Sequence, residues 1–266
     1  MELHISALYH YPVKSCRGIA LDSARLTPYG LERDRHWMVV DVKGRFLTQR
    51  RFPQMALIEA VPSGDELTLR APGMPPLAVA AAVENPLGIR IWGFEGEARD
   101  AGDVAAHWLS KFLRFDCRLA AGSPALKRSV DPDYDRFGSE VLFADGFPFL
   151  LISEASLASL NARLATSVPM NRFRPNIVVS GCEPHAEDDW RILRVGEGLV
   201  FHVVKPCSRC TVPTVDQATG ERGAEPTVTL SGYRKADDSK IYFGQNLIHE
   251  TKTGVLRVGD VVTVLA

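Results

Sequence analysis

The strongest chemical signal in the sequence is a pair of cysteines, Cys207 and Cys210, with two residues between them. A zinc ion in a protein is usually held by four ligands, often supplied by two such pairs. The other three cysteines are isolated in the sequence, so histidines would have to complete a zinc site. The histidines available for that role are His185, His202 and His249.

Three other interpretations of this cysteine pair are open. A redox dithiol of the thioredoxin type needs a strand-to-helix setting, whereas residues 211–215 favour an extended chain. A single thiolate could instead bind a redox metal or a metal-bearing cofactor, and Arg209 between the cysteines would favour the thiolate form. The simplest interpretation is two small, half-buried cysteines at a strand end, and spacing alone favours it.

Two segments could bind an anion at the ends of strands. Pro12 removes one hydrogen-bond donor from a strand, so the chain is expected to leave the sheet there, and Lys14 and Ser15 could then clamp a phosphate. An exposed lysine is the commoner outcome. The turn at 145–148 could offer its backbone amides to an anion, although the same residues are equally typical of a plain turn.

Two further runs carry charged residues beside apolar segments. Arg33 and Arg35 flank Asp34, and in an extended segment the two arginines point to one side. We expect either an internal Asp–Arg pair or an arginine that faces an anion. Alternate residues of 172–176 are Arg, Arg and Asn, which predicts one polar face as a strand begins. One lone thiol with scattered cationic anchors suits a large anionic cofactor held between two domains.

The elements that must position these residues are mostly short strands. A helix is predicted after Gly102, with Asp103 as its N-cap, and a second from Ser153 to Leu164. Strands are expected in the first half at 3–8, 36–41, 46–48, 56–61, 66–70 and 89–92. In the second half they are expected at 177–179, 199–204, 227–230, 247–249, 254–258 and 261–265.

These elements predict an α+β, mostly β fold. We expect two β-barrel-like domains with a few helices and a cofactor held between them. The polar segment 121–139 reads as an exposed connection, which places the domains at 1–120 and 121–266. At roughly 150 residues per domain, a length of 266 residues agrees with two domains.

Composition excludes several classes of protein. Lys and Arg total 31 and Asp and Glu total 32, so the net charge of -1 gives no electrostatic reason to bind nucleic acid or an anionic membrane. No apolar run approaches the ~20 residues of a membrane helix, and the first residues lack the pattern of a secretory signal. Five cysteines, an odd and low number, do not indicate a disulfide framework. A cytoplasmic location is expected.

Several motifs, taken in order, resemble the MOSC family. Residues 11–18, 30–37 and 48–55 are similar to an N-terminal MOSC β-barrel domain. Matches to the MOSC domain proper lie at 153–157, 171–177, 207–210, 243–247 and 258–260. The resemblance covers nearly the whole chain. It extends to the mitochondrial amidoxime-reducing components and to bacterial MOSC reductases that detoxify N-hydroxylated bases.

The resemblance implies a molybdenum cofactor of the sulfite-oxidase type, in which a pterin dithiolene supplies two sulfurs and the protein one cysteine thiolate. It assigns the catalytic and metal-ligating role to Cys210. The residues that it assigns to the pterin phosphate and its surroundings are Lys14, Ser15 and Arg35. Those that it assigns to the pterin are Arg174, Asn176, Ser208 and Arg209. The turn residues that it adds are Asp145, Gly146 and Phe147. Hydroxyl residues stand at the last two positions in the mitochondrial relative, so only backbone contacts would remain there.

The reaction implied by the resemblance is R–NHOH plus two electrons and two protons giving R–NH2 and water, with the oxygen removed at molybdenum. The expected substrates are hydroxylaminopurine-type bases, amidoximes and hydroxylamines. No cysteine follows Cys210, so no iron–sulfur cluster is expected in the tail. Electrons would then come from a separate protein, such as a flavin reductase, a ferredoxin or a cytochrome b5-like protein.

Another class stays open. The family is also proposed to include proteins that carry sulfur on a reactive cysteine, and a protein could carry the cofactor without turnover. A sulfur carrier needs no phosphate anchors, so the presence of Lys14, Arg35 and Arg174 favours the cofactor interpretation.

Overall fold

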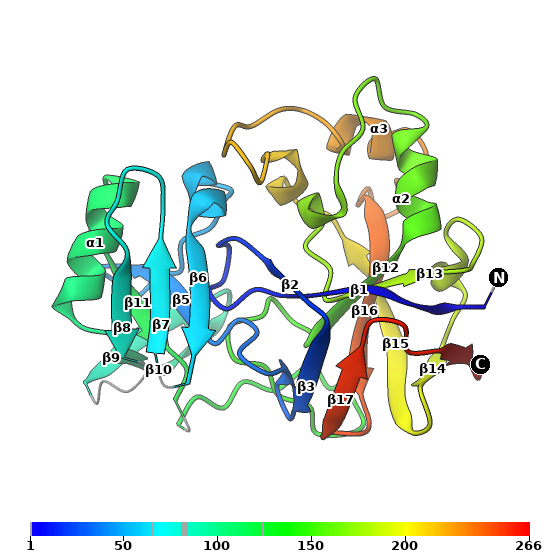
Figure 1. The fold of residues 1–266 in the computed structure, drawn as a ribbon, viewed down its shortest axis with the longest axis horizontal. Coiled ribbons are helices and arrows are strands. Elements are labelled where there is room, and N and C mark those ends of the chain that lie inside the picture. The colour runs from blue at the N-terminus through cyan, green and yellow to red at the C-terminus, as the bar shows by residue number, and fades with distance from the viewer. Residues whose placement is uncertain (1, 65, 81–84, 124) are drawn as a thin grey trace.

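The computed structural model describes residues 2–64, 66–80, 85–123 and 125–266. In this part the chain is mostly β with a few helices, as expected, and its strands form four sheets (Figure 1). Each sheet ends in two edge strands, so the described strands do not form a closed barrel. No described helix has the length and apolarity that a membrane crossing requires.

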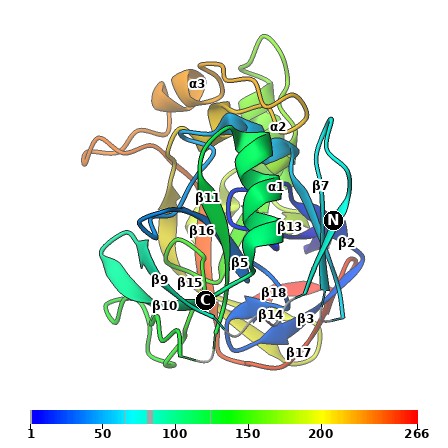
Figure 2. The same cartoon turned by 90° about the vertical axis from the view of Figure 1, so that its left-hand side faces the viewer.

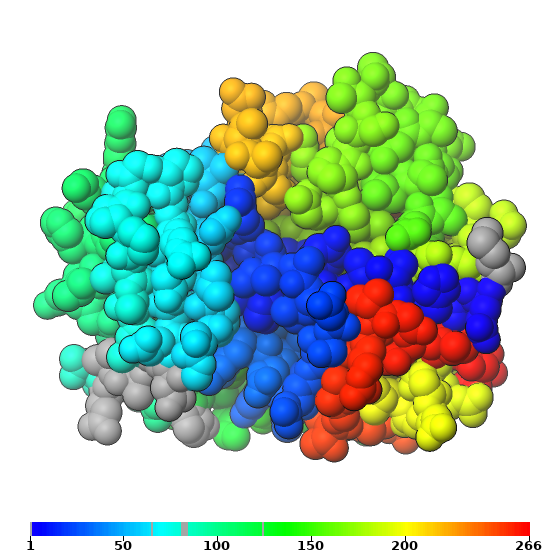
Figure 3. Space-filling view, viewed as in Figure 1, coloured from blue at the N-terminus to red at the C-terminus, as the bar shows by residue number. Residues whose placement is uncertain are grey.

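The largest sheet joins the two ends of the chain. Its strands, in spatial order, are β18 (Val262–Val264), β14 (Ile192–Val195), β15 (Leu199–Ser208), β16 (Tyr242–His249), β12 (Phe149–Ser153), β13 (Ile177–Ser180), β1 (His4–His10) and β2 (Ile19–Leu21). β1 pairs antiparallel with β13, whereas β12 and β13 run parallel. The N-terminal residues therefore cross the centre of the molecule, and Figure 3 shows them in dark blue between the cyan and red segments.

Three smaller sheets complete the β structure. The four-stranded sheet holds β5 (Trp37–Asp41), β11 (Cys117–Ala121), β10 (Phe94–Asp100) and β9 (Pro86–Ile91). One three-stranded sheet holds β17 (Gly254–Arg257), β3 (Ser23–Thr27) and β4 (Gly30–Leu31), and the other holds β6 (Glu59–Ser63), β7 (Glu66–Arg70) and β8 (Leu77–Ala80). The pairing of β3 with β17 again ties the start of the chain to its end. The division at 120 stays a prediction.

The helices lie on the flanks of the sheets. They are α1 (Asp103–Leu113), α2 (Glu154–Asn161) and α3 (Thr227–Ser231), with 3-10 turns η1 (Pro53–Leu57), η2 (Met170–Arg172), η3 (Ala186–Asp188) and η4 (Val212–Thr214). α1 packs on β11, and Figure 2 shows it on the face turned to the viewer. Its buried Trp108, Leu109 and Leu113 join the core beneath β5 and β7, which buries the apolar stripe that predicted this helix.

Four local predictions are corrected by the structure. Residues 227–230 form α3 rather than a strand, because burial of Leu230 outweighs the β preference of the neighbouring Thr and Val residues. Residues 46–48 do not form a strand, since only Phe46 makes an isolated bridge, to Val40, and α2 ends at Asn161 rather than at Leu164. Gly102, not Asp103, caps α1.

The predicted N-terminal cap was wrong for α1 and right for α2, and the geometry of the two caps explains the difference. The cap of α1 has a φ of +91°, a conformation that glycine adopts readily. The Asp103 carboxylate instead accepts a hydrogen bond from Arg118 at 2.6 Å. In α2 the predicted start is confirmed, since the Ser153 hydroxyl accepts from the Ser156 amide at 3.0 Å.

Candidate functional site

A cavity of about 340 Å³ lies where the N-terminal segment meets the C-terminal half of the chain. All the residues that the family resemblance assigned to the cofactor line this one cavity. They are Lys14, Ser15, Arg35, Asp145, Gly146, Phe147, Arg174, Asn176, Ser208, Arg209 and Cys210. The fold thus brings five separate segments of the chain together, while the individual roles of these residues stay predictions.

Lys14 follows β1 and is buried, with 5% of its surface exposed, rather than lying in solvent. Its ammonium donates to the Phe143 carbonyl at 2.8 Å and to Asp145 Oδ1 at 2.7 Å. Burial lowers the pKa of Lys14, and the Asp145 carboxylate opposes this effect. Burial alone would raise the pKa of Asp145, but Lys14 and the Trp92 indole N–H outweigh it and hold that pKa well below its usual range.

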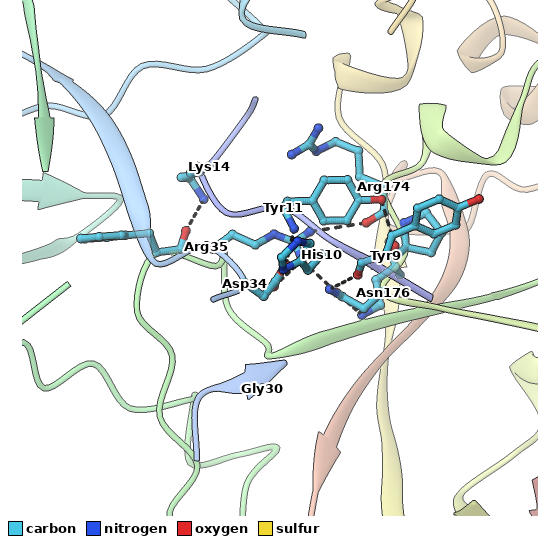
Figure 4. A network of polar contacts seen from close by, with 12 residues as sticks. Tyr9, His10, Tyr11, Lys14, Gly30, Asp34, Arg35, Arg174 and Asn176 are labelled. Atoms are coloured by element: carbon cyan, nitrogen blue, oxygen red, sulfur yellow. Dashed lines mark hydrogen bonds and ion pairs between the residues drawn. The ribbon is translucent and has the colours of Figure 1, made fainter. Parts of the chain in front are cut away.

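Two arginines from different halves of the chain meet at Tyr11, as the close-up in Figure 4 shows. The guanidinium carbon of Arg35 lies 4.3 Å from the centre of the Tyr11 ring, and that of Arg174 lies 4.2 Å from it. The ring is 1% exposed, and its hydroxyl donates to the Pro175 carbonyl at 2.9 Å. Cation–π contacts of this kind are strongest where water is excluded.

Arg35 is held in place from both halves. Its Nη1 donates to Asp34 Oδ2 at 2.6 Å and to Asn176 Oδ1 at 2.9 Å. Asp34 also accepts from the Tyr11 amide at 2.7 Å, which confirms the expected internal Asp–Arg pair. Arg33 and Arg35 are not extended, however, because both have a positive φ, of 63° and 44°.

Arg174 is buried at the other side of the Tyr11 ring. Its Nη1 donates to the Cys16 carbonyl at 2.7 Å, and burial lowers the pKa of Arg174 to about 10. The expected alternation over residues 172–176 is wrong, because η2 occupies residues 170–172 and Arg174 has a φ of +59°. Arg172 consequently points away and pairs with Asp216 at 2.8 Å.

The cysteine motif lies at the end of β15, which runs as far as Ser208. Cys210 is exposed, and its sulfur accepts from the Val212 amide at 3.5 Å. Cys207 is half-buried, and Arg209 donates from Nη1 to its sulfur at 3.2 Å and from Nη2 to the Phe173 carbonyl at 2.8 Å. All five cysteines are free thiols.

The zinc interpretation finds no support in this geometry. His202 pairs with Glu250 at 3.0 Å, and His249 donates from Nε2 to the Thr27 carbonyl at 2.7 Å. Within residues 2–64, 66–80, 85–123 and 125–266, no group of three or more His, Cys, Asp or Glu side chains is placed to hold a metal ion.

The turn from Asp145 to Phe147 is fixed from behind by Arg128. This arginine is 9% exposed and donates to the carbonyl groups of Leu142, Ala144 and Asp145. The segment 121–139, residue 124 apart, was expected to be exposed, but Arg128 and Val130 are buried in it. Here a buried arginine satisfies carbonyl groups that the turn would otherwise leave without donors.

Four polar lining residues were not singled out from the sequence. They are Thr48, Arg50, Lys205 and Asn246. Arg50 lies in the motif at 48–55, whose resemblance to the family could have drawn attention to it. Lys205 has no such signal, since it lies within an apolar strand that was predicted only as far as residue 204.

The residues that line the cavity suit a negatively charged cofactor that carries a metal. Six cationic side chains face the cavity, namely Lys14, Arg35, Arg50, Arg174, Lys205 and Arg209, against a single carboxylate, Asp145. Such an excess of positive charge matches a phosphate-bearing group. The exposed thiol of Cys210 would supply, as a thiolate, one more sulfur ligand to a metal that a dithiolene already holds through sulfur. The residues present therefore fit a molybdenum-pterin cofactor.

Comparison with known proteins identifies the family. Residues 2–116 match the MOSC N-terminal beta barrel domain and residues 138–263 match the MOSC domain. The human mitochondrial amidoxime-reducing component 1 is 38% identical over 98% of this chain and 82% of its own length. The bovine mitochondrial amidoxime reducing component 2 is also 38% identical, over 97% of this chain and 82% of its own length.

Among solved structures, the YUAD protein from Bacillus subtilis aligns with a TM-score of 0.41 and 10% sequence identity, over 98% of this chain and 94% of that chain. The sequence relatives match along nearly the whole chain, and the two domain matches follow one another in order. The chain belongs to the MOSC family, with an N-terminal MOSC beta barrel domain followed by a MOSC domain, and is homologous to the mitochondrial amidoxime-reducing components.

Proposed function

We propose that this protein is a molybdenum-cofactor-dependent reductase of N-hydroxylated compounds. The observation that carries the proposal is the single cavity in which an exposed cysteine thiol faces an excess of cations. The relatives are named for the reduction of amidoximes, which supports the same reaction class. The substrates would be hydroxylaminopurine-type bases, amidoximes and hydroxylamines.

The bound cofactor would supply the two-electron exchange with the substrate, and the chain would supply binding and position. Cys210 would lose its proton and ligate the metal through Sγ. Lys14, Ser15 and Arg35 would hold the phosphate. Because Lys14 and Arg35 are already fixed by carboxylates at 2.7 and 2.6 Å, they would bind it without rearrangement.

The remaining candidates would hold the pterin itself. Arg174 and Asn176 reach the cavity from the segment before β13, and Ser208 and Arg209 reach it from the end of β15. The Gly146 and Phe147 side chains have no polar atoms, so these two positions would contribute only backbone contacts. Arg209 is itself oriented by the Phe173 carbonyl, so its guanidinium would meet the pterin in one position.

We infer that a separate protein of the flavin reductase, ferredoxin or cytochrome b5-like type would donate the electrons, and that the protein would act in the cytoplasm. The proposed reaction would use no iron–sulfur cluster in this chain, and no nucleic acid or membrane would be a partner. The reaction R–NHOH plus two electrons and two protons giving R–NH2 and water needs that donor for each turnover.

The deciding experiment is a measurement of metal and pterin content. The protein is purified from a host that makes molybdenum cofactor, beside Cys210→Ser and, as a matched control, Cys182→Ala, whose thiol lies outside the cavity. We expect close to one molybdenum and one pterin per chain in the wild type and in Cys182→Ala, with molybdenum lost from Cys210→Ser. Benzamidoxime and N-hydroxycytidine with a chemical reductant then test turnover.

Two results would refute the proposal. Absence of both molybdenum and pterin from protein made in a competent host removes the reductase, and a persulfide on Cys210 found by mass spectrometry would indicate the sulfur-carrier class instead. Stoichiometric cofactor without reduction of any N-hydroxylated compound would indicate a cofactor carrier.

A further inference from the structure

Two of the six cations in the cavity differ from the others in how they are held. Lys14 and Arg35 have carboxylate partners, and Arg174 and Arg209 donate to backbone carbonyls. Arg50 and Lys205 have no carboxylate partner anywhere in the described chain. The one hydrogen bond from the Arg50 side chain is a long one, from Nε to Thr48 Oγ1 at 3.4 Å.

Arg50 is held by an aromatic ring instead. Its guanidinium carbon lies 4.6 Å from the centre of the Trp92 ring. Trp92 sits in the turn between β9 and β10 with a φ of +54°, and its indole N–H donates to Asp145 Oδ1 at 3.1 Å. A tryptophan in the left-handed region is unusual and persists only where its surroundings fix it. This ring therefore holds Arg50 near Asp145, where the Arg50 charge helps to lower the pKa of the Asp145 carboxyl although the two side chains form no ion pair.

Lys205 is held in the same manner from the opposite half of the chain. Its ammonium lies 4.1 Å from the centre of the Tyr134 ring, and Tyr134 contacts Phe147 edge to face at 5.8 Å. The two rings that hold these cations therefore both contact the turn that contains Asp145 and Phe147. Two cations that have no ion-pair partner among the described residues thus line the cavity on either side of this turn.

We propose that Arg50 and Lys205 form a subsite for a phosphate monoester at the Asp145 end of the cavity. A phosphate dianion needs both positive charge and several hydrogen-bond donors. The free N–H groups of the two side chains supply these, while Gly146 and Phe147 supply no side-chain donor. The phosphate could be that of the cofactor, in which case Arg50 and Lys205 would add to the anchor formed by Lys14, Ser15 and Arg35 beside Asp145. It could instead belong to a phosphorylated substrate, and only that choice of source rests on the function proposed above.

Phosphate binding to the cofactor-free protein tests the subsite directly. The full chain is made in a host that lacks the pterin pathway, and inorganic phosphate is titrated by calorimetry. Because a hydrogen bond to a charged group contributes about tenfold or more in affinity, we expect Arg50→Met and Lys205→Met each to weaken phosphate binding about tenfold. Lys205→Arg, which keeps the charge, should restore most of the affinity.

Lys111→Met is the matched control, because Lys111 is an exposed cation on α1 outside the cavity. It should leave the phosphate affinity unchanged. Unfolding midpoints of all four variants, compared with the wild type, verify that each is folded. The titration needs neither metal nor turnover, so its result is independent of whether the protein proves to be a reductase.

The same titration on cofactor-loaded protein distinguishes the sources. If loading abolishes phosphate binding and the two Met variants also retain less pterin, the cofactor phosphate fills the subsite. If loaded protein still binds phosphate, the subsite accepts a substrate phosphate, and N-hydroxycytidine 5′-monophosphate should then bind more tightly than N-hydroxycytidine. Equal phosphate affinity in the wild type and both Met variants would overturn the proposal.

Discussion

The ring of Tyr11 separates two guanidinium groups that would repel each other if they met directly. Arg35 and Arg174 lie 4.3 and 4.2 Å from the ring centre, and neither faces water to any great extent. Buried charges of like sign are stable only where partners offset the loss of hydration. Asp34, the Cys16 carbonyl and the Tyr11 ring are those partners, so the site depends on one residue with no chemical role of its own.

Two substitutions of Tyr11 should distinguish the contribution of its hydroxyl to stability from the contribution of its ring. Tyr11→Phe removes only the bond to the Pro175 carbonyl and should lower the free energy of unfolding by about 1 kcal/mol. Tyr11→Leu also removes both cation–π contacts and should cost about 3 kcal/mol. Urea unfolding measures both values. Equal values for the two variants would show that the ring contributes nothing through the arginines.

At the scale of elements, His249 connects two sheets. It lies on β16 and donates to the Thr27 carbonyl at the end of β3. Its ring contacts Phe149 at 5.0 Å and Phe201 at 6.5 Å between ring centres. Burial lowers the pKa of His249 from 6.5 to about 4, although the bond to Thr27 opposes this effect. The histidine is therefore neutral where the sheets are packed.

This lowered pKa makes stability depend on pH. Between pH 6.5 and about 4 the unfolded chain binds a proton at His249 that the folded chain does not. The contribution of His249 is thus fully present above pH 6.5 and is lost as the pH falls toward 4. The loss between pH 7 and pH 4.5 should be about 2 kcal/mol. Urea unfolding at pH 7 and pH 4.5 measures this loss in the free energy of unfolding. The loss should be smaller by about 2 kcal/mol in His249→Gln than in the wild type. The same loss in both proteins would contradict the role given to His249.

At the scale of the whole molecule, the segment after the cysteine motif fastens the two halves of the chain. Gln217 and Gln49 exchange two amide hydrogen bonds, of 2.9 and 3.1 Å, and both are buried. Arg222 donates to the carbonyl groups of Gln49 and Arg50. In Figure 1 this segment (orange) reaches across the top of the molecule toward η1. The element that carries Cys210 is thereby fixed to the N-terminal half.

Breaking this connection should weaken the molecule as a unit. Gln217→Ala leaves Gln49 with an unsatisfied buried carbonyl oxygen and should lower the free energy of unfolding by about 2 kcal/mol. Gln54→Ala, which loses one long bond to the Leu113 carbonyl, is the control and should change it by less than about 1 kcal/mol. Thermal and urea unfolding provide the measurement. A loss in Gln217→Ala no larger than in Gln54→Ala would mean that the segment does not fasten the halves.

The sequence alone identified the mostly β architecture, the start of α2 at Ser153 and eleven of the residues that line the cavity, but it missed Thr48, Arg50, Lys205 and Asn246. Periodicity and capping are local properties, so they can be read from neighbouring residues. The motif order also placed the chain in its family. Even so, the strand predicted at 227–230 is a helix, because packing of Leu230 decided a segment whose local preference was weak.

Only the tertiary structure decided how the cations are neutralised. For Lys14 an exposed position was the commoner alternative to a phosphate anchor, yet its side chain is buried against Asp145, 131 residues away in the sequence. Among the described residues Arg50 and Lys205 have no carboxylate ion-pair partner, and the rings that contact them, Trp92 and Tyr134, come from distant parts of the chain. Burial and charge pairing depend on which segments meet, and that is fixed by long-range packing rather than by the residues on either side.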